Sequence, residues 1–418
     1  MAEEKYVYFF GNGKAEGNGE MKQLLGGKGA GLAEMTRAKL PVPAGFTITT
    51  EVCQLYYSNN KKYPAGLERS VKENLQKLEK SAGKKLGDPN DPLLVSVRSG
   101  APVSMPGMME TILNLGLTDK SVEGLAKKTS NRRFALDAYR RFIMMYGSTA
   151  MGIDRIKFDD LFDEVKEKHT RGRLNIAAGK KVGDTDVNED ELAEVITKFK
   201  ALYKKEIKKD FPQDPIEQLW GAIGAVFNSW MAEKAVTYRR VENLVGIKGT
   251  AVNVMQMVFG NKGDTSGTGV CFTRDPNSGE NIFYGDYLFN AQGEDVVAVG
   301  AHQDLEDLLQ PLPGLRLLPH ALQEPQVLTQ RDQAARGHCQ GHASRDPPRC
   351  RPHGSSVSWC WWPWLRGGAR CAGCPARLVG SRGIVSSLTL GAVDSSMSPT
   401  SHGGRAWTTS TTTTVTLS

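Results

Sequence analysis

The composition of the chain changes abruptly near residue 300, and this change limits what can fold as one body. Residues 1–300 contain every Lys, Phe, Tyr and Asn of the 418-residue sequence, whereas residues 301–418 hold five of the seven Cys and five of the seven Trp. The later part is interrupted by Pro and ends in the low-complexity run "TTSTTTTVTLS". We therefore expect a folded body over residues 1–300 and an irregular or disordered tail over residues 301–418. The loss of four common residue types suggests a shifted reading frame or a misjoined gene.

Charge gives no reason to expect a nucleic-acid partner. The formal net charge is +7, and +4 of it lies in residues 301–418, which leaves the body nearly balanced. The sequence has no apolar run of the roughly 18 residues that a membrane span needs, and its start, "MAEEKYVYFFGNG", has no signal-peptide pattern. We therefore expect a cytoplasmic chain with no nucleic-acid and no membrane partner.

Hydrophobic patterns divide the body into three parts. Residues 1–118 predict a mixed α/β subdomain, in which "AGFTITTEVCQLYY" runs from a strand into a helix and "DPLLVSVRSG" is a buried strand. Residues 119–243 predict a mostly helical insert and return, with helical spacing in "NRRFALDAYRRFIMMYG" and an amphipathic helix in "NEDELAEVITKFKALYKKEI". Residues 244–300 are β-rich and predict the start of a second lobe.

The stretch "MKQLLGGKGAGLAEM", residues 21–35, surrounds Lys28 with four glycines. Glycines let a backbone approach a ligand closely, and the helix start that should follow them favours anions. The stretch is not a Walker A loop, because Gly29 follows the lysine where that motif requires Ser or Thr. Two interpretations stay open from these residues alone: a phosphate-binding lysine, or a simple glycine turn before a helix.

A second stretch, "SVRSGAPVSMPGMMETILNLGL", places Arg98 at the end of a predicted strand. An arginine there can grip phosphate oxygens through two parallel hydrogen bonds. The loop Gly100–Met109 that follows has the glycines, prolines and serine of a segment that can fold over a ligand. The alternative is an arginine paired with a carboxylate, followed by a methionine-rich loop packed into the core.

A third stretch, "FGNKGDTSGTGVCFTRDPNSGE", predicts a glycine-rich loop between two strands. Downstream of it, Asp286 and Glu294 are carboxylates on a β-rich segment. Carboxylates beside a nucleotide can bind Mg²⁺ or the ribose hydroxyls. The alternative for this stretch is a long hairpin with solvated acids.

Taken together, the three stretches resemble the N-terminal nucleotide-binding domain of the pyruvate, phosphate dikinase family. The resemblance rests on "LLGGKGAGLAEM", "PLLVSVRSGAPVSMPGMMETILNLGL", "DAYRRFI" and "GTAVNVMQMVFGNKGDTSGTGVCFTRDPNSGE", and it covers about residues 5–298. It implies an α/β (α+β) fold with an ATP-grasp-like, two-lobed nucleotide-binding domain that carries a helical insert. The second lobe would be incomplete at residue 300.

The resemblance also implies an activity. The family binds ATP with Mg²⁺, transfers the β-phosphoryl group to a histidine on a separate domain and the γ-phosphoryl group to phosphate, and then makes phosphoenolpyruvate from pyruvate. Positioning and charge neutralisation dominate such transfers. Arg98 matches a catalytic position, and no residue is assigned as a metal ligand. The positions expected to contact ATP are Lys28, Arg98, Gly100, Ser104, Gly107, Met257, Phe259, Asp286 and Glu294. In this resemblance the segment Met255–Gly260 is a strand beside the adenine.

The chain departs from the family after residue 298. The family's later ATP-binding stretch, its phosphohistidine motif and its barrel, through which it dimerises, have no counterpart in residues 301–418, and "TSH" at 400–402 looks like a chance match. An incomplete second lobe should leave an exposed sheet edge and poor solubility. The main alternative is therefore an ATP-binding fragment or regulatory decoy without turnover. A structural role, a glucan-phosphorylating dikinase and a zinc site formed by the tail cysteines are weaker alternatives. Those cysteines are Cys350, Cys360, Cys371 and Cys374.

Overall fold

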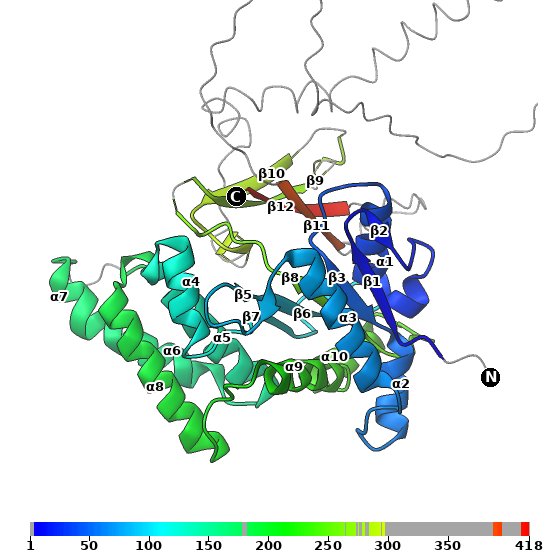
Figure 1. Ribbon diagram of the computed structural model, residues 1–418, viewed down its shortest axis with the longest axis horizontal. Helices are drawn as coiled ribbons and strands as arrows, with labels where there is room; N and C mark the ends of the chain where they lie inside the picture. The colour runs from blue at the N-terminus through cyan, green and yellow to red at the C-terminus, as the bar shows by residue number, and fades with distance from the viewer. Residues whose placement is uncertain are drawn as a thin grey trace, which may run out of the picture. The chain divides into compact units, whose positions relative to one another are not determined.

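The computed structural model describes most of the first 296 residues and two segments near the C-terminus (Figure 1). The described residues are 4–177, 182–263, 265–272, 275, 278–280, 284–293, 295–296, 388–394 and 411–417. Glu294, the tail cysteines and the "TSH" tripeptide lie outside them.

A six-stranded antiparallel sheet forms the centre of the N-terminal body, in the order β2-β1-β3-β8-β6-β7. Its strands are β1 (Val7–Gly11), β2 (Lys14–Ala15), β3 (Gly45–Ile48), β6 (Val95–Gly100), β7 (Thr111–Leu115) and β8 (Ala251–Gln256). The expected strands in "AGFTITTEVCQLYY" and "DPLLVSVRSG" are confirmed as β3 and β6. Their buried apolar side chains form the core of the sheet, with Phe46, Val97 and Val254 fully enclosed.

The position of β8 differs from the expected division of the chain at residue 243. β8 lies between β3 and β6, where its residues pair with both neighbours. Residues 251–256 therefore complete the first sheet instead of starting the second lobe. Their apolar pattern shows a buried strand, but a pattern of this kind does not say which sheet receives it.

Among the described residues, three α-helices accompany the first sheet and seven more follow between β7 and β8. Figure 1 shows how they are arranged around the sheet. The first three are α1 (Lys22–Arg37), α2 (Thr50–Ser58) and α3 (Leu67–Ala82), and a short parallel pair, β4 (Lys85–Leu86) and β5 (Pro92–Leu93), follows α3. The others are α4 (Ser121–Thr129), α5 (Arg132–Met145), α6 (Arg155–Val165), α7 (Arg171–Arg173), α8 (Glu189–Ile207), α9 (Pro215–Ser229) and α10 (Glu233–Val241). Among the described helices, none combines the length and apolar character needed to cross a bilayer.

The helical character of the insert is thus confirmed, and local sequence explains its best-defined helix. α8 begins with a reciprocal cap, in which the Asn188 side chain accepts from the Glu191 backbone N–H and the Glu191 carboxylate accepts from the Asn188 N–H. Acidic residues fill its first turn and lysines its last, as the helix dipole favours.

The second sheet has four strands in the order β10-β9-β12-β11. The two strands expected on either side of the glycine-rich loop are β8 and β9 (Gly267–Phe272), which lie in different sheets, and β10 (Tyr284–Phe289) pairs with β9. β11 (Leu388–Asp394) and β12 (Thr411–Leu417) come from the tail, and β12 pairs with β9. The expectation of an irregular tail is wrong for these two segments, and β9 has no free edge. Their β-branched residues favour strands even within a low-complexity run.

Candidate functional site

The glycine-rich stretch around Lys28 lies at a break within α1, where Gly26 separates a short first segment from the helix that carries Lys28. α1 is interrupted at Gly26, whose φ of 71° and ψ of 168° are not helical. Just after this kink the Gly27 N–H donates to the Ala101 carbonyl oxygen at 2.9 Å. A Cβ on Gly26 would lie only 1.7 Å from the Gly100 carbonyl oxygen. The glycines therefore let the α1 backbone touch the end of β6.

This backbone contact brings the two predicted phosphate-binding cations near one another. Lys28 lies two residues after the kink and Arg98 two residues before the end of β6, and both are half-buried. Burial, with the positive charge of Arg98 as a second cause, lowers the pKa of Lys28 from 10.5 to about 8. No ion pair involves Lys28 among the residues that the structure describes. The site has the charge and the glycine backbone that an anionic ligand requires.

Asn253 and Thr47 complete this region, and sequence reasoning missed both. Asn253 is the partner of Arg98 in the β6–β8 ladder, and its Oδ1 accepts from the buried Thr47 hydroxyl at 2.8 Å. A Cβ on Gly29 would lie 2.8 Å from Thr47, and one on Gly100 would lie 2.6 Å from Asn253 Nδ2. A polar Asn in the apolar strand "AVNVMQ" was the available signal.

The loop 101–110 connects β6 to β7 and carries Ser104 and Gly107. Gly107 is exposed with a φ of 69°, and a Cβ there would meet nothing within 4 Å. Met105, in contrast, is buried, and Glu110 at the loop's end forms a 2.7 Å ion pair with Lys234 of α10. The loop thus has an exposed tip between two attachment points, and Met105 packs in the core as the alternative expected; that the loop covers a ligand stays a prediction.

The two residues expected near the adenine differ in their surroundings. β8 ends at Gln256, so the expected strand Met255–Gly260 is shorter than predicted. Met257 is half-buried, and its N–H donates to the Leu94 carbonyl oxygen at 2.9 Å. Phe259 is buried edge-to-face against Phe134 of α5, with 5.1 Å between ring centroids. Phe259 is therefore a core residue in this structure.

Asp286 lies in the second sheet, apart from the two cations in the topology. It is half-buried on β10 opposite Val270 of β9. Lys28 and Arg98 belong instead to α1 and to β6 of the first sheet, and Glu294 lies outside the described residues. Within the same described part, no three His, Cys, Asp or Glu side chains form a group that could hold a metal ion.

The α/β body, with its glycine-kinked helix and two neighbouring cations, belongs to a known family of domains. The sequence profile described as "Pyruvate phosphate dikinase, AMP/ATP-binding domain" matches residues 22–63 and 59–306. This match covers more than half of the chain. The chain therefore belongs to the family of pyruvate phosphate dikinase AMP/ATP-binding domains.

Individual relatives agree with this assignment. The chain is 52% identical over 312 residues to pyruvate, phosphate dikinase of Clostridium symbiosum. The aligned region covers 74% of this chain and 34% of the relative. It is 50% identical over 311 residues to the chloroplastic pyruvate, phosphate dikinase 1 of Arabidopsis thaliana, with 74% and 31% covered. It is 50% identical over 294 residues to the Rhizobium meliloti enzyme, with 70% and 32% covered. The chain thus spans about a third of the length of these relatives.

Proposed function

We propose that the chain binds ATP with Mg²⁺ and supplies the nucleotide-binding part of a pyruvate, phosphate dikinase reaction. In that reaction ATP, pyruvate and phosphate give AMP, phosphoenolpyruvate and diphosphate. The observation that carries the proposal is that two half-buried cations, Lys28 and Arg98, lie near one another at the contact between α1 and β6. Two neighbouring cations repel each other, and a polyphosphate relieves that repulsion when it binds.

The proposed roles follow from side-chain chemistry. Lys28 supplies a mobile point charge to the phosphate oxygens, and Arg98 offers a planar fork for two parallel hydrogen bonds and stabilises the transferring phosphoryl group. Gly100, Ser104 and Gly107 would cover the phosphates. Met257 would contact the adenine. For Phe259 this role would require exposure of a ring that now packs on Phe134.

Magnesium is proposed to reach the site mainly through the nucleotide. Mg²⁺ in such sites is commonly held by one or two carboxylates together with substrate phosphates. Asp286 and Glu294 are the carboxylates proposed for this task or for the ribose hydroxyls. The ion would neutralise phosphate charge, while Lys28 and Arg98 orient the phosphates.

The alternative is an ATP-binding chain without turnover, as in a regulatory decoy. Phosphoryl transfer in this family would pass to a histidine on another domain, then to pyruvate. Cytoplasmic location, and dimerisation through a domain outside the matched region, are likewise proposals at the level of the family.

Calorimetric titration with MgATP tests the binding proposal. We expect Lys28→Ala to weaken binding about 10- to 100-fold, the effect of losing one hydrogen bond to a charged group. Lys22→Ala is the matched control, because Lys22 is exposed at the first residue of the same helix. Absence of ATP binding by the parent chain, or equal effects of the two substitutions, would contradict the proposal.

AMP formation separates the two functions. The parent chain is incubated with MgATP, phosphate and pyruvate, together with a separately produced chain that carries the acceptor histidine and the pyruvate-binding domain of a relative, and AMP and phosphoenolpyruvate are measured. Production of both, abolished by Arg98→Ala, supports the dikinase reaction. ATP binding without AMP supports the decoy.

A further inference from the structure

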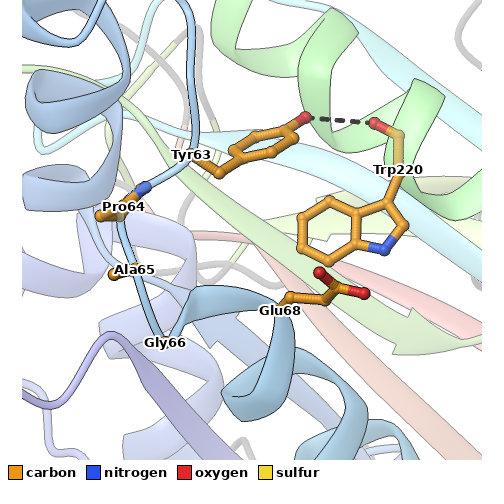
Figure 2. A pocket seen from close by; sticks show the side chains of 6 residues that line it. All are labelled: Tyr63, Pro64, Ala65, Gly66, Glu68 and Trp220. Carbon is orange, nitrogen blue, oxygen red and sulfur yellow. Dashed lines mark hydrogen bonds between the residues drawn. The ribbon is translucent and has the colours of Figure 1, made fainter.

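A surface pocket of about 450 Å³ lies where the segment before α3 faces α9 (Figure 2). Its lining residues are Tyr63, Pro64, Ala65, Gly66, Glu68 and Trp220. None of them belongs to the proposed phosphate site. The dikinase reaction therefore leaves this pocket without a role.

Two aromatic rings form one wall of the pocket. The Tyr63 and Trp220 ring centroids are 4.9 Å apart with a 48° angle between planes, and the Tyr63 hydroxyl donates to the Trp220 carbonyl oxygen at 3.3 Å. Behind Tyr63, Tyr56 packs at 5.3 Å and in turn contacts Phe227. This stacking and the hydrogen bond fix the rings, so the wall is preformed.

Glu68 supplies the negative charge of the pocket. It lies in the first turn of α3, and Figure 2 shows its carboxylate directed to the side of the Trp220 ring. It is exposed and has no hydrogen bond or ion pair with any described residue. Glu73 on the same helix differs, because Arg69 binds it at 2.9 Å. The Glu68 carboxylate is therefore available to a ligand.

Aromatic faces beside an available carboxylate select a cation. Ring faces attract cations and repel anions, and a carboxylate adds charge-assisted hydrogen bonds. Among organic cations, a guanidinium is planar enough to stack on an indole while its fork of N–H groups reaches a carboxylate. We propose that this pocket binds a guanidinium group, carried either by a free arginine-like molecule or by an arginine side chain of another protein.

Ligand-observed NMR titration of the full chain tests this proposal with N-acetylarginine amide. The neutral isostere N-acetylcitrulline amide is the ligand control. We expect the arginine amide to bind with a dissociation constant of about a millimolar and the citrulline amide to bind at least about tenfold more weakly. Equal binding of the two amides, or no binding of the arginine amide, would overturn the proposal.

Matched variants assign the binding to this pocket. Glu68→Gln should weaken arginine-amide binding about tenfold, whereas Glu73→Gln on the same helix should leave it unchanged. Trp220→Phe, which keeps an aromatic ring but a weaker one, should give an intermediate loss. Circular dichroism checks that each variant is folded. Equal affinity of the Glu68 and Glu73 variants would refute the assignment.

A longer probe separates the two sources of the guanidinium. The peptide Gly-Gly-Arg-Gly-Gly, acetylated at its N-terminus and amidated at its C-terminus, is titrated in the same way. Tighter binding than that of the arginine amide identifies a protein partner, because flanking backbone then contributes. Equal or weaker binding identifies a small free ligand. Since ATP binding involves none of these residues, a failure here leaves the proposed ATP function unaffected.

Discussion

Two clusters of partly or fully buried charge differ in how they are neutralised. In helix α5, the Asp137 carboxylate binds Arg140 at 2.6 Å and Arg141 at 3.0 Å, and all three side chains are largely enclosed. At the contact of α1 with β6, Lys28 and Arg98 are both positive. The first cluster is balanced within the protein, because Arg140 also pairs with Asp184 at 3.6 Å and Arg141 with Asp295 at 3.0 Å. The second has two neighbouring positive charges, whose repulsion a bound anion would relieve.

The pKa values show the same difference. Burial alone would raise the pKa of Asp137, but the guanidinium groups of Arg140 and Arg141 outweigh burial and hold it far below its usual range. For Lys28, burial and the Arg98 charge act in the same direction and lower the pKa. A half-buried lysine whose pKa is lowered both by burial and by a neighbouring cation is thus a better indicator of a binding site than burial of charge itself.

The largest expected loss of stability comes from removing the shared carboxylate of the balanced cluster in α5. Asp137→Ala leaves two buried guanidinium groups without their shared carboxylate, and we expect a loss of about 3–5 kcal/mol in the free energy of unfolding. Asp159→Ala is the control, since Asp159 forms an exposed 3.5 Å pair with Arg155 and should change stability by less than about 1 kcal/mol. Urea unfolding followed by circular dichroism measures both. Similar losses would show that the α5 cluster does not stabilise the fold.

A somewhat smaller effect should come from the backbone contact that builds the cationic cluster. Gly26→Ala adds a Cβ 1.7 Å from the Gly100 oxygen at a φ of 71°, so we expect a loss of about 3 kcal/mol. Gly31→Ala in the same helix meets nothing within 4 Å and should gain up to about 1 kcal/mol. Urea unfolding measures both. A stable Gly26 variant with full ATP affinity would mean that α1 and β6 need not touch.

The smallest expected change in stability comes from the half-buried positive charge of Lys28. The pKa of Lys28 is 10.5 unfolded and about 8 folded, so the unfolded chain binds more protons between these values and stability rises with pH across that window. Lys28→Met should therefore be more stable than the parent at pH 7, by on the order of 2 kcal/mol. That advantage should shrink between about pH 8 and pH 10.5. A difference independent of pH would show that Lys28 is not perturbed.

The local sequence pattern predicted the helices and strands of this fold better than it predicted which strands pair with one another. The helix in "NEDELAEVITKFKALYKKEI" and the strand in "DPLLVSVRSG" follow from residue spacing and capping, which act within a few residues. The insertion of β8 between β3 and β6 pairs Asn253 with Thr47 and Arg98, which are 206 and 155 positions earlier in the chain, and no local signal specifies such pairing. The same limit applies to β12. It pairs with β9, although the residues between the two strands have a composition that differs from that of the body.

The candidate site was predictable to a similar degree. Lys28 and Arg98 were proposed from glycine context and a strand end, because both signals are local, and the structure places them near one another. Asn253 was missed, since its importance depends on its place beside Arg98 in the assembled sheet. Phe259 was assigned to the adenine by its neighbours in sequence, whereas its ring packs on Phe134. The roles of all site residues remain predictions.

The hydrogen bond from Gly27 to Ala101 sets where the covering loop can bend. Because the bond and the Gly26–Gly100 contact tie the end of β6 to α1, a swing of the loop that preserves both must pivot downstream of Ala101. The Glu110–Lys234 ion pair sets the other pivot. Within these limits the buried side chain of Met105 is a further attachment, so the part that can move without displacing it is the short tip 106–109, which contains Gly107. Opening and closing over a nucleotide would leave Lys28 and Arg98 stationary.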